Sequence, residues 1–101
     1  MAASVSYGVS EGVAEIVMNR APVNAINLEL ARGVIDAYKR AKDDESVRAV
    51  ILTSALPTVF SAGLDLKLAL DFDSAALRGF IEVFYYEMHE VLYRLGKPVI
   101  A

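Results

Sequence analysis

The chain has 101 residues, of which 55% are hydrophobic and 23% charged, so its composition is that of a globular domain and excludes a disordered segment. A net charge of −3 and ten scattered Lys and Arg residues argue against a nucleic-acid partner, because phosphate binding needs clustered basic residues. Cysteine is absent, which excludes disulfides, thiolate zinc sites and a cysteine nucleophile.

The N-terminal stretch MAASVSYGVSEG lacks the basic region and apolar core of a signal peptide. No apolar run in the sequence approaches the length of a membrane span. We therefore expect a soluble, cytoplasmic protein without a membrane partner.

The first half of the chain predicts a hairpin, a helix and a buried strand. Residues 5–9 and 13–19 have the apolar pattern of strands, and SEG at 10–12 is typical of a turn. After the loop RAPVNAIN, Asn27 is predicted to cap a helix over residues 28–43. The residues expected in its buried stripe are Leu30, Val34, Ala37, Tyr38 and Ala41.

Residues 47–53, VRAVILT, are almost continuously apolar, which is typical of a parallel strand buried on both faces. Strand, helix and strand in this order predict a right-handed crossover and an α/β fold.

The second half predicts two helices and one more strand. A short helix is expected from Asp65, a cap within residues 71–74, and a long helix over 75–95 that Gly96 ends. Its expected buried face comprises Leu77, Ile81, Phe84, Met88, Val91 and Leu95. KPVIA then begins another buried strand. A domain rarely ends on an unpaired apolar edge, so we expect residues 1–101 to be the N-terminal part of a longer protein.

Three small residues, Ser61, Ala62 and Gly63, lie at the predicted carboxyl end of a parallel strand, where α/β folds bind ligands. Gly63 can adopt a backbone geometry closed to other residues. The N–H groups of Leu64 and Asp65 would then begin a helix without intrahelical partners, free to bind an anion or a developing oxyanion. The alternative is a tight loop with Asp65 as a structural cap.

The ordered set APVNAI, VRAVILTS, FSAGLDLK and KPVIA resembles the N-terminal half of the enoyl-CoA hydratase/isomerase (crotonase) family, and FSAGLDL is similar to the version in Δ3,Δ2-enoyl-CoA isomerases. The resemblance implies a spiral of ββα units and action on acyl-CoA thioesters, by isomerisation or hydration of an enoyl-CoA. It also implies two backbone N–H groups that bind the thioester oxygen as it becomes an enolate. No metal or cofactor beyond the CoA of the substrate is implied, and the expected assembly is a homo-oligomer, a trimer or a dimer of trimers.

The resemblance assigns one oxyanion donor to the N–H of Leu64. The residues that it implies at the CoA arm and thioester are Pro22, Val23, Ala25, Ala62, Gly63, Leu64, Asp65 and Leu66. Many hydratases carry a Lys where this chain has Ala21, so one CoA contact of the family is not expected here. The second donor and the acid/base carboxylates follow the KPVIA strand in the family, and none is assigned within this chain.

Two other functions stay open: a non-catalytic scaffold or CoA-binding module on the same fold, and a hydrolase or peptidase that would need a Ser nucleophile with a His base. Ser61 is a poor nucleophile candidate, because His89 is the sole histidine and nothing in the sequence places it near Ser61. His89 has no second metal ligand at useful spacing and is expected at a surface or interface. FYYEMH, residues 84–89, either packs in the core or lines an acyl pocket. A solvated face is expected for Glu82, Glu87 and Glu90.

Overall fold

A β-hairpin begins the fold in the computed structural model, which describes residues 4–101. Strands β1 (Val5–Ser10) and β2 (Val13–Met18) pair antiparallel along their whole length. The turn residues Glu11 and Gly12 have φ values of 52° and 81°. Positive φ at both central positions is what a two-residue type I′ turn requires, and this turn matches the twist of the strands that it joins. The predicted hairpin is confirmed.

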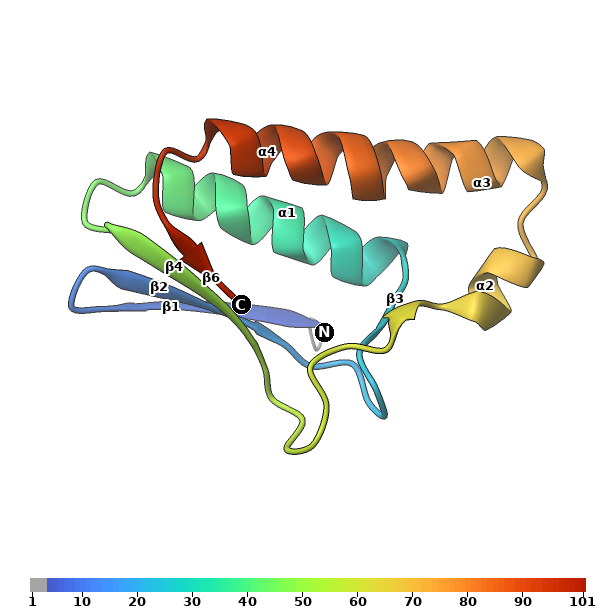
Figure 1. The fold of residues 1–101 in the computed structure, drawn as a ribbon, viewed down its shortest axis with the longest axis horizontal. Coiled ribbons are helices and arrows are strands. Elements are labelled where there is room, and N and C mark those ends of the chain that lie inside the picture. Colours follow the sequence, from blue (N-terminus) through green and yellow to red (C-terminus); the bar gives the residue numbers. More distant parts are fainter. Residues whose placement is uncertain (1–3) are drawn as a thin grey trace.

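The sheet is completed by two parallel strands. β4 (Ala49–Ser54) pairs with β2, and β6 (Val99–Ile100) pairs with β4, which gives the order β1-β2-β4-β6. Helix α1 (Leu28–Asp43) connects β2 to β4 and lies against the sheet (Figure 1). The predicted strand–helix–strand unit is therefore present, with its two strands parallel.

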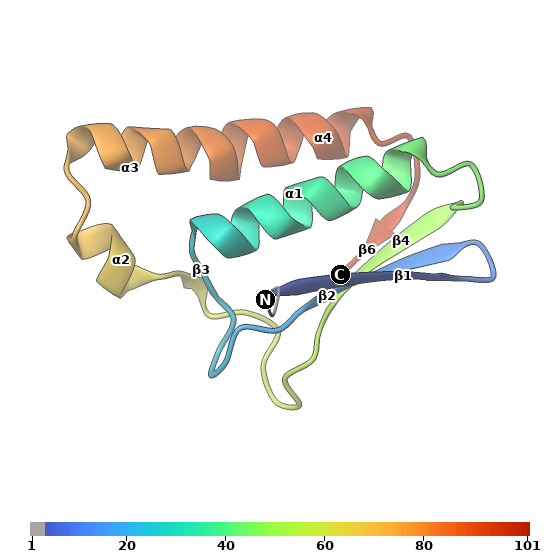
Figure 2. The ribbon, with the colours of Figure 1, turned by 180° about the vertical axis from the view of Figure 1, so that it is seen from behind.

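Burial of β4 differs from the prediction. Val50 is fully buried on the side of α1, whereas the next residue, Ile51, which points to the opposite face, is half-buried. The helices lie over one face of the sheet, as the views from front and back show (Figure 2). The expectation that residues 47–53 are buried on both faces is wrong for the described chain, because nothing within residues 4–101 covers the second face.

Helix α1 has the predicted bounds and cap. The side chain of Asn27 accepts a hydrogen bond from the N–H of Leu30 at 2.9 Å. At the other end, Lys97 Nζ donates to the carbonyls of Ala41 and Asp44 at 2.7 and 2.9 Å, which places a cation at the negative end of the helix dipole. The five residues predicted for the buried stripe are all buried, together with Ala31 and Ile35.

The predicted long helix is continuous but contains a wide turn. It consists of α3 (Ser74–Ile81), the π-helical stretch η1 (Glu82–Glu87) and α4 (Met88–Arg94), and it packs along α1. The side chain of Asp73 caps its start by accepting from Ala76 N at 2.7 Å. Gly96, with φ 71°, follows its end.

The wide turn changes which residues of this helix are buried. Val91 and Leu95 are buried and Phe84 and Met88 half-buried, as predicted. Leu77 and Ile81 are instead 37% and 43% exposed, while Phe80 and Val83 are buried. A π turn closes its hydrogen bond over five residues in place of four and so adds about one residue to the turn. The buried face before it therefore lies at positions that an α-helical period does not predict.

Two helical glycines allow the close packing of α1 on β1 to be tested. A Cβ on Gly33 would lie 2.7 Å from Val5 Cγ2, whereas one on Gly79 of α3 would meet no atom within 4 Å. Alanine favours a helix over glycine by about 1 kcal/mol, and overpacking costs about 1–3 kcal/mol. We expect Gly79→Ala to raise the free energy of unfolding of the purified protein, measured in urea. The free energy of unfolding of Gly33→Ala should be about 1–3 kcal/mol lower than that of Gly79→Ala. Equal effects of the two substitutions would contradict the close contact.

Candidate functional site

The two loops singled out in the sequence lie side by side. Strand β3 (Ala25–Ile26) pairs in parallel with β5 (Gly63–Leu64), in the register Ala25 to Gly63 and Ile26 to Leu64. A further hydrogen bond, from Ala62 N to the carbonyl of Val23 at 2.9 Å, extends the contact. Figure 1 shows this pair beside the first turn of α1 and the short helix α2 (Leu66–Leu70). All eight predicted site residues therefore occupy two adjoining segments.

The two N–H groups predicted as donors, those of Leu64 and Asp65, differ in their surroundings. Gly63 has φ 88°, in the left-handed region that favours glycine. The N–H of Asp65 donates to the carbonyl of Ile26 at 3.0 Å, so the expectation that it is free is wrong. Successive N–H groups of an extended strand point to opposite edges, so the N–H of Leu64 points away from β3. Of the two predicted donors, Leu64 alone stays a candidate.

Asp65 is held as a structural anion. Its Oδ1 accepts from the N–H of Leu68 at 3.2 Å and caps α2, and its Oδ2 pairs with Arg20 Nη1 at 3.0 Å. These contacts, the Leu68 N–H first and the Arg20 guanidinium second, lower the pKa of the Asp65 carboxyl. The same Arg20 nitrogen donates to the carbonyl of Ala25 at 2.8 Å. The predicted role of Asp65 as an ionised cap is supported, and each of its two carboxylate oxygens has a partner, Leu68 N–H for one and Arg20 for the other.

The predicted site residues of the two segments differ in their exposure to solvent. Ala25 and Gly63 are half-buried. The exposed members of the set are Pro22, Val23, Ala62, Leu64 and Leu66. Because the residues around Gly63 are small or exposed, another molecule can approach the backbone of β5.

Asn24, between two predicted contact residues, is a functional candidate that the sequence interpretation missed. Its side chain is fully buried and its φ is 50°. Nδ2 donates to Ser54 Oγ at 2.7 Å and to the carbonyl of Phe60 at 2.9 Å, and Oδ1 accepts from Arg20 N at 2.7 Å. A signal was present in the sequence, because Asn is a polar residue that tolerates positive φ and it stands here within an otherwise apolar loop, PVNAI.

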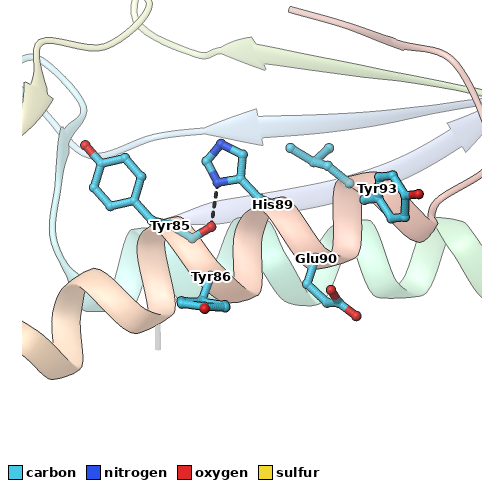
Figure 3. A pocket seen from close by; sticks show the side chains of 6 residues that line it. Tyr85, Tyr86, His89, Glu90 and Tyr93 are labelled. Atoms are coloured by element: carbon cyan, nitrogen blue, oxygen red, sulfur yellow. Dashed lines mark hydrogen bonds between the residues drawn. The ribbon is translucent and has the colours of Figure 1, made fainter.

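The structure does not bring together the Ser61 and His89 of the hydrolase alternative. Ser61 Oγ donates to the carbonyl of Asn24 at 2.7 Å and accepts from Gly63 N at 3.0 Å. His89 lies exposed on α4, where its Nδ1 bonds to the carbonyl of Tyr85 (Figure 3). Within residues 4–101 no hydrogen bond joins the two side chains, so a Ser–His nucleophile is not supported.

The aromatic segment 84–89 divides between core and surface. Phe84 and Met88 turn inward and line an apolar cavity of about 170 Å³ that reaches the loop residues Phe60 and Ser61. Tyr85 and Tyr86 are 56% and 77% exposed and line, with His89, a surface hollow (Figure 3). Core packing is therefore confirmed for Phe84 and Met88, whereas Tyr85, Tyr86 and His89 face solvent. That the segment lines an acyl pocket stays a prediction.

Two of the three acidic residues expected on a solvated face of the long helix are exposed, and the third is not. Glu82 and Glu90 are exposed, and Glu90 pairs with Arg94. The half-buried Glu87 pairs with Arg32 of α1 at 2.8 Å. Among residues 4–101 there is no group of three or more His, Cys, Asp or Glu side chains placed to hold a metal ion. None of the helices in this part of the chain combines the length and apolar character needed to cross a membrane.

Comparison with known sequences identifies the family. The family model described as enoyl-CoA hydratase/isomerase matches residues 8–101. Carnitinyl-CoA dehydratase of Proteus mirabilis is 32% identical over 108 residues, covering 100% of this chain and 38% of the relative. Mitochondrial enoyl-CoA delta isomerase 1 of Rattus norvegicus is 42% identical over 55 residues, covering 54% of this chain and 19% of the relative. The chain belongs to the enoyl-CoA hydratase/isomerase family, and it spans 38% of the length of the dehydratase.

Solved structures agree on the fold. DspI of Pseudomonas aeruginosa superimposes with a TM-score of 0.85 at 25% identity, covering 95% of this chain and 39% of the other. An enoyl-CoA hydratase from Bacillus anthracis gives a TM-score of 0.85 at 26% identity, covering 95% of this chain and 38% of the other. The predicted α/β, crotonase-like fold is confirmed for this portion. The isomerase-like character of FSAGLDL stays a prediction, because a dehydratase and an isomerase both match.

The Asp65 carboxylate should stabilise the folded state at neutral pH. Its pKa is lowered on folding from an unfolded value of about 3.9, so the stabilisation is complete above that value and lost as the pH falls through the folded pKa. We expect the difference in unfolding free energy between the parent and Asp65→Asn to be largest above about pH 5 and to shrink below about pH 4. Urea unfolding at a series of pH values measures it. A difference independent of pH would show that the ionised carboxylate has no such role.

Proposed function

We propose that this chain provides the thioester-carbonyl side of an enoyl-CoA hydratase or isomerase site, with the N–H of Leu64 as one oxyanion donor. Family membership supports the substrate class. The observation that carries the proposal is the bond from Asp65 N to Ile26 O, because alternation along an extended strand then turns the Leu64 N–H away from β3. A backbone donor at this place needs no particular side chain at position 64.

The proposed role follows from the chemistry of a thioester. Removal of an α-proton forms an enolate and places negative charge on the carbonyl oxygen. An N–H group already fixed at that position stabilises the charge most when it forms, and so lowers the barrier more than it tightens binding of the ground state. The reaction needs no redox cofactor or metal, and CoA enters only as part of the substrate.

The two adjoining segments also suit the CoA arm. The exposed Pro22, Val23 and Ala62 offer small side chains and accessible backbone beside the donor, and Leu66 presents an exposed apolar side chain. The charge of Asp65, between Leu64 and Leu66, is balanced by Arg20 and would repel CoA phosphates less than a free carboxylate. The proposal includes a cytoplasmic protein that assembles as a trimer or a dimer of trimers, as the family resemblance implies.

The proposal places the acid/base carboxylates outside this chain. Asp65 is the carboxylate next to Leu64 in the sequence, and it is bound to Arg20 and the Leu68 N–H. Glu87 and Glu90 are each paired with an arginine, Arg32 of α1 and Arg94 of the same helix. A complete site therefore requires further residues that supply the base.

Two substitutions at Leu64 test the donor in the complete gene product. Leu64→Met keeps the N–H and the approximate volume, so we expect nearly unchanged turnover. Leu64→Pro removes the N–H, and kcat should fall by about 10² or more, the usual scale for one lost oxyanion donor. Hydration of crotonyl-CoA and isomerisation of a 3-enoyl-CoA measure the effect.

Thermal stability and CoA affinity must be measured for both variants, because proline also restricts Gly63. Near-parental turnover by a folded Leu64→Pro protein would end the assignment of the donor. Retained CoA binding without any turnover by the unsubstituted protein would favour the non-catalytic CoA-binding module.

The 101-residue polypeptide by itself should show no enoyl-CoA turnover, because the proposed general base is not among its residues. The same two assays on the purified polypeptide, against a mock purification from the same host, measure this. Turnover that follows the polypeptide through purification would place the base within residues 1–101 and would contradict the proposal.

A further inference from the structure

We propose that Asn24 is a positioning residue of this site, whose buried amide fixes the direction of the Leu64 N–H. The inference rests on the proposed function of Leu64 as an oxyanion donor. It concerns a side chain that does not itself touch the thioester: Asn24 is fully buried and all of its polar groups are engaged by protein atoms.

The Asn24 amide joins three parts of the backbone. Its Nδ2 donates to Ser54 Oγ, at the end of β4, and to the carbonyl of Phe60, with a longer bond of 3.5 Å to the carbonyl of Met18. Its Oδ1 accepts from the N–H of Arg20, which follows β2. All three hydrogen bonds are part-buried, so loss of the amide would leave polar groups short of a hydrogen bond. The amide thus connects Arg20, which precedes β3, with Phe60, which precedes β5.

The hydrogen bonds continue from Asn24 to the residue before Leu64. The carbonyl of Asn24 accepts from Ser61 Oγ, and the same Oγ accepts from the N–H of Gly63. On the far side of Leu64, the Asp65 carboxylate is held by Arg20. Leu64 therefore lies between Gly63 and Asp65, both of which are held by hydrogen bonds. Asn24 contributes to the position of Gly63 through its backbone carbonyl, which bonds Ser61, and through its side chain, which bonds the carbonyl of Phe60.

Position 24 also restricts which residues can fill the role. With φ at 50° the backbone is left-handed, a conformation that Asn, Asp and Gly adopt more readily than other residues. Asn is the member of this group that can donate two hydrogen bonds and accept others from one neutral side chain. The Asn24→Asp substitution would keep the shape and the acceptor for Arg20 N but turn an oxygen toward the carbonyl of Phe60, and a glycine would keep only the backbone.

The expected signature is a loss of kcat with little change of KM. An oxyanion donor must lie about 2.7–3.1 Å from the oxygen as charge develops, and a displacement of about 1 Å can cost about 10²-fold in rate. Binding of the CoA arm is spread over both segments and is less sensitive to such a shift. A residue that acted on stability alone would leave kcat of the folded fraction unchanged.

The test compares Asn24→Asp and Asn24→Gly with Asn27→Ala in the complete gene product. Asn27 caps α1 and has no bond to the loop before Leu64, so its loss lowers stability without moving the donor. We expect both Asn24 variants to lose at least about tenfold in kcat with KM within about twofold, and Asn27→Ala to keep kcat within about twofold. A folded Asn24→Asp protein whose kcat matches that of Asn27→Ala would overturn the inference.

A double substitution separates this inference from the proposed function. If Asn24 acts through Leu64, Asn24→Asp should reduce the residual turnover of Leu64→Pro by less than about twofold. If folded Leu64→Pro keeps parental turnover, the proposed function fails. If Leu64→Pro loses turnover and Asn24→Asp does not, only the positioning role fails.

A spectroscopic measurement covers variants with too little activity to assay. In ¹⁵N spectra the amide resonances of Gly63 and Leu64 should shift in Asn24→Asp and stay in place in Asn27→Ala. Unshifted Gly63 and Leu64 amides in a folded Asn24→Asp protein would overturn the inference without reference to turnover.

Discussion

The buried amide of Asn24 is the interaction on which the site depends. A polar side chain without partners would be costly at a fully buried position, so the fold is stable there only while Arg20, Ser54 and Phe60 all lie within hydrogen-bond distance. That requirement couples the ends of β2 and β4 to the loop before β5. The short β3–β5 pair, with two residues in each strand, joins the same two loops beside the amide.

Charge at the site is arranged so that the backbone, and not a carboxylate, faces a ligand. Arg20 and the first turn of α2 hold both oxygens of Asp65, which lowers its pKa and makes it unsuited to accept a proton near neutral pH. The Leu64 N–H beside it points the other way. Adjacent residues of an extended chain present their N–H groups to opposite sides, so the Asp65 N–H can bond Ile26 while that of Leu64 is directed away from β3.

Packing of the helices places this site at one end of the sheet. α1 lies close to β1 at Gly33, and the long helix packs along α1 through Val91 and Leu95. The π-helical stretch η1 lies where Phe84 turns toward the cavity beside Phe60. The same wide turn leaves Tyr85 and Tyr86 on the outer surface, so one aromatic segment contributes both to the core and to the exterior (Figure 3).

Local chemistry in the sequence alone determined most elements of the fold. The hairpin turn at Glu11 and Gly12, the caps at Asn27 and Asp73 and the helix end at Gly96 depend on residues close to each other in the chain, and all are present. Gly63 belongs to the same group, since its left-handed backbone is a property of glycine. Family membership followed from the order of several such motifs and not from any one of them.

Tertiary structure decided the rest, because those features join residues that are distant in sequence. Whether the Asp65 N–H is free depends on Ile26, and whether Asn24 is exposed or buried depends on Ser54 and Phe60. Within residues 4–101 the second face of β4 is uncovered, because α1 and the long helix both lie over the other face of the sheet. Periodicity misplaced Leu77 and Ile81 because a π turn, which no local signal marks here, changes the number of residues per turn. Hydrogen bonds and packing between remote segments leave no periodic pattern of residues in the sequence, so they are seen only in the folded chain.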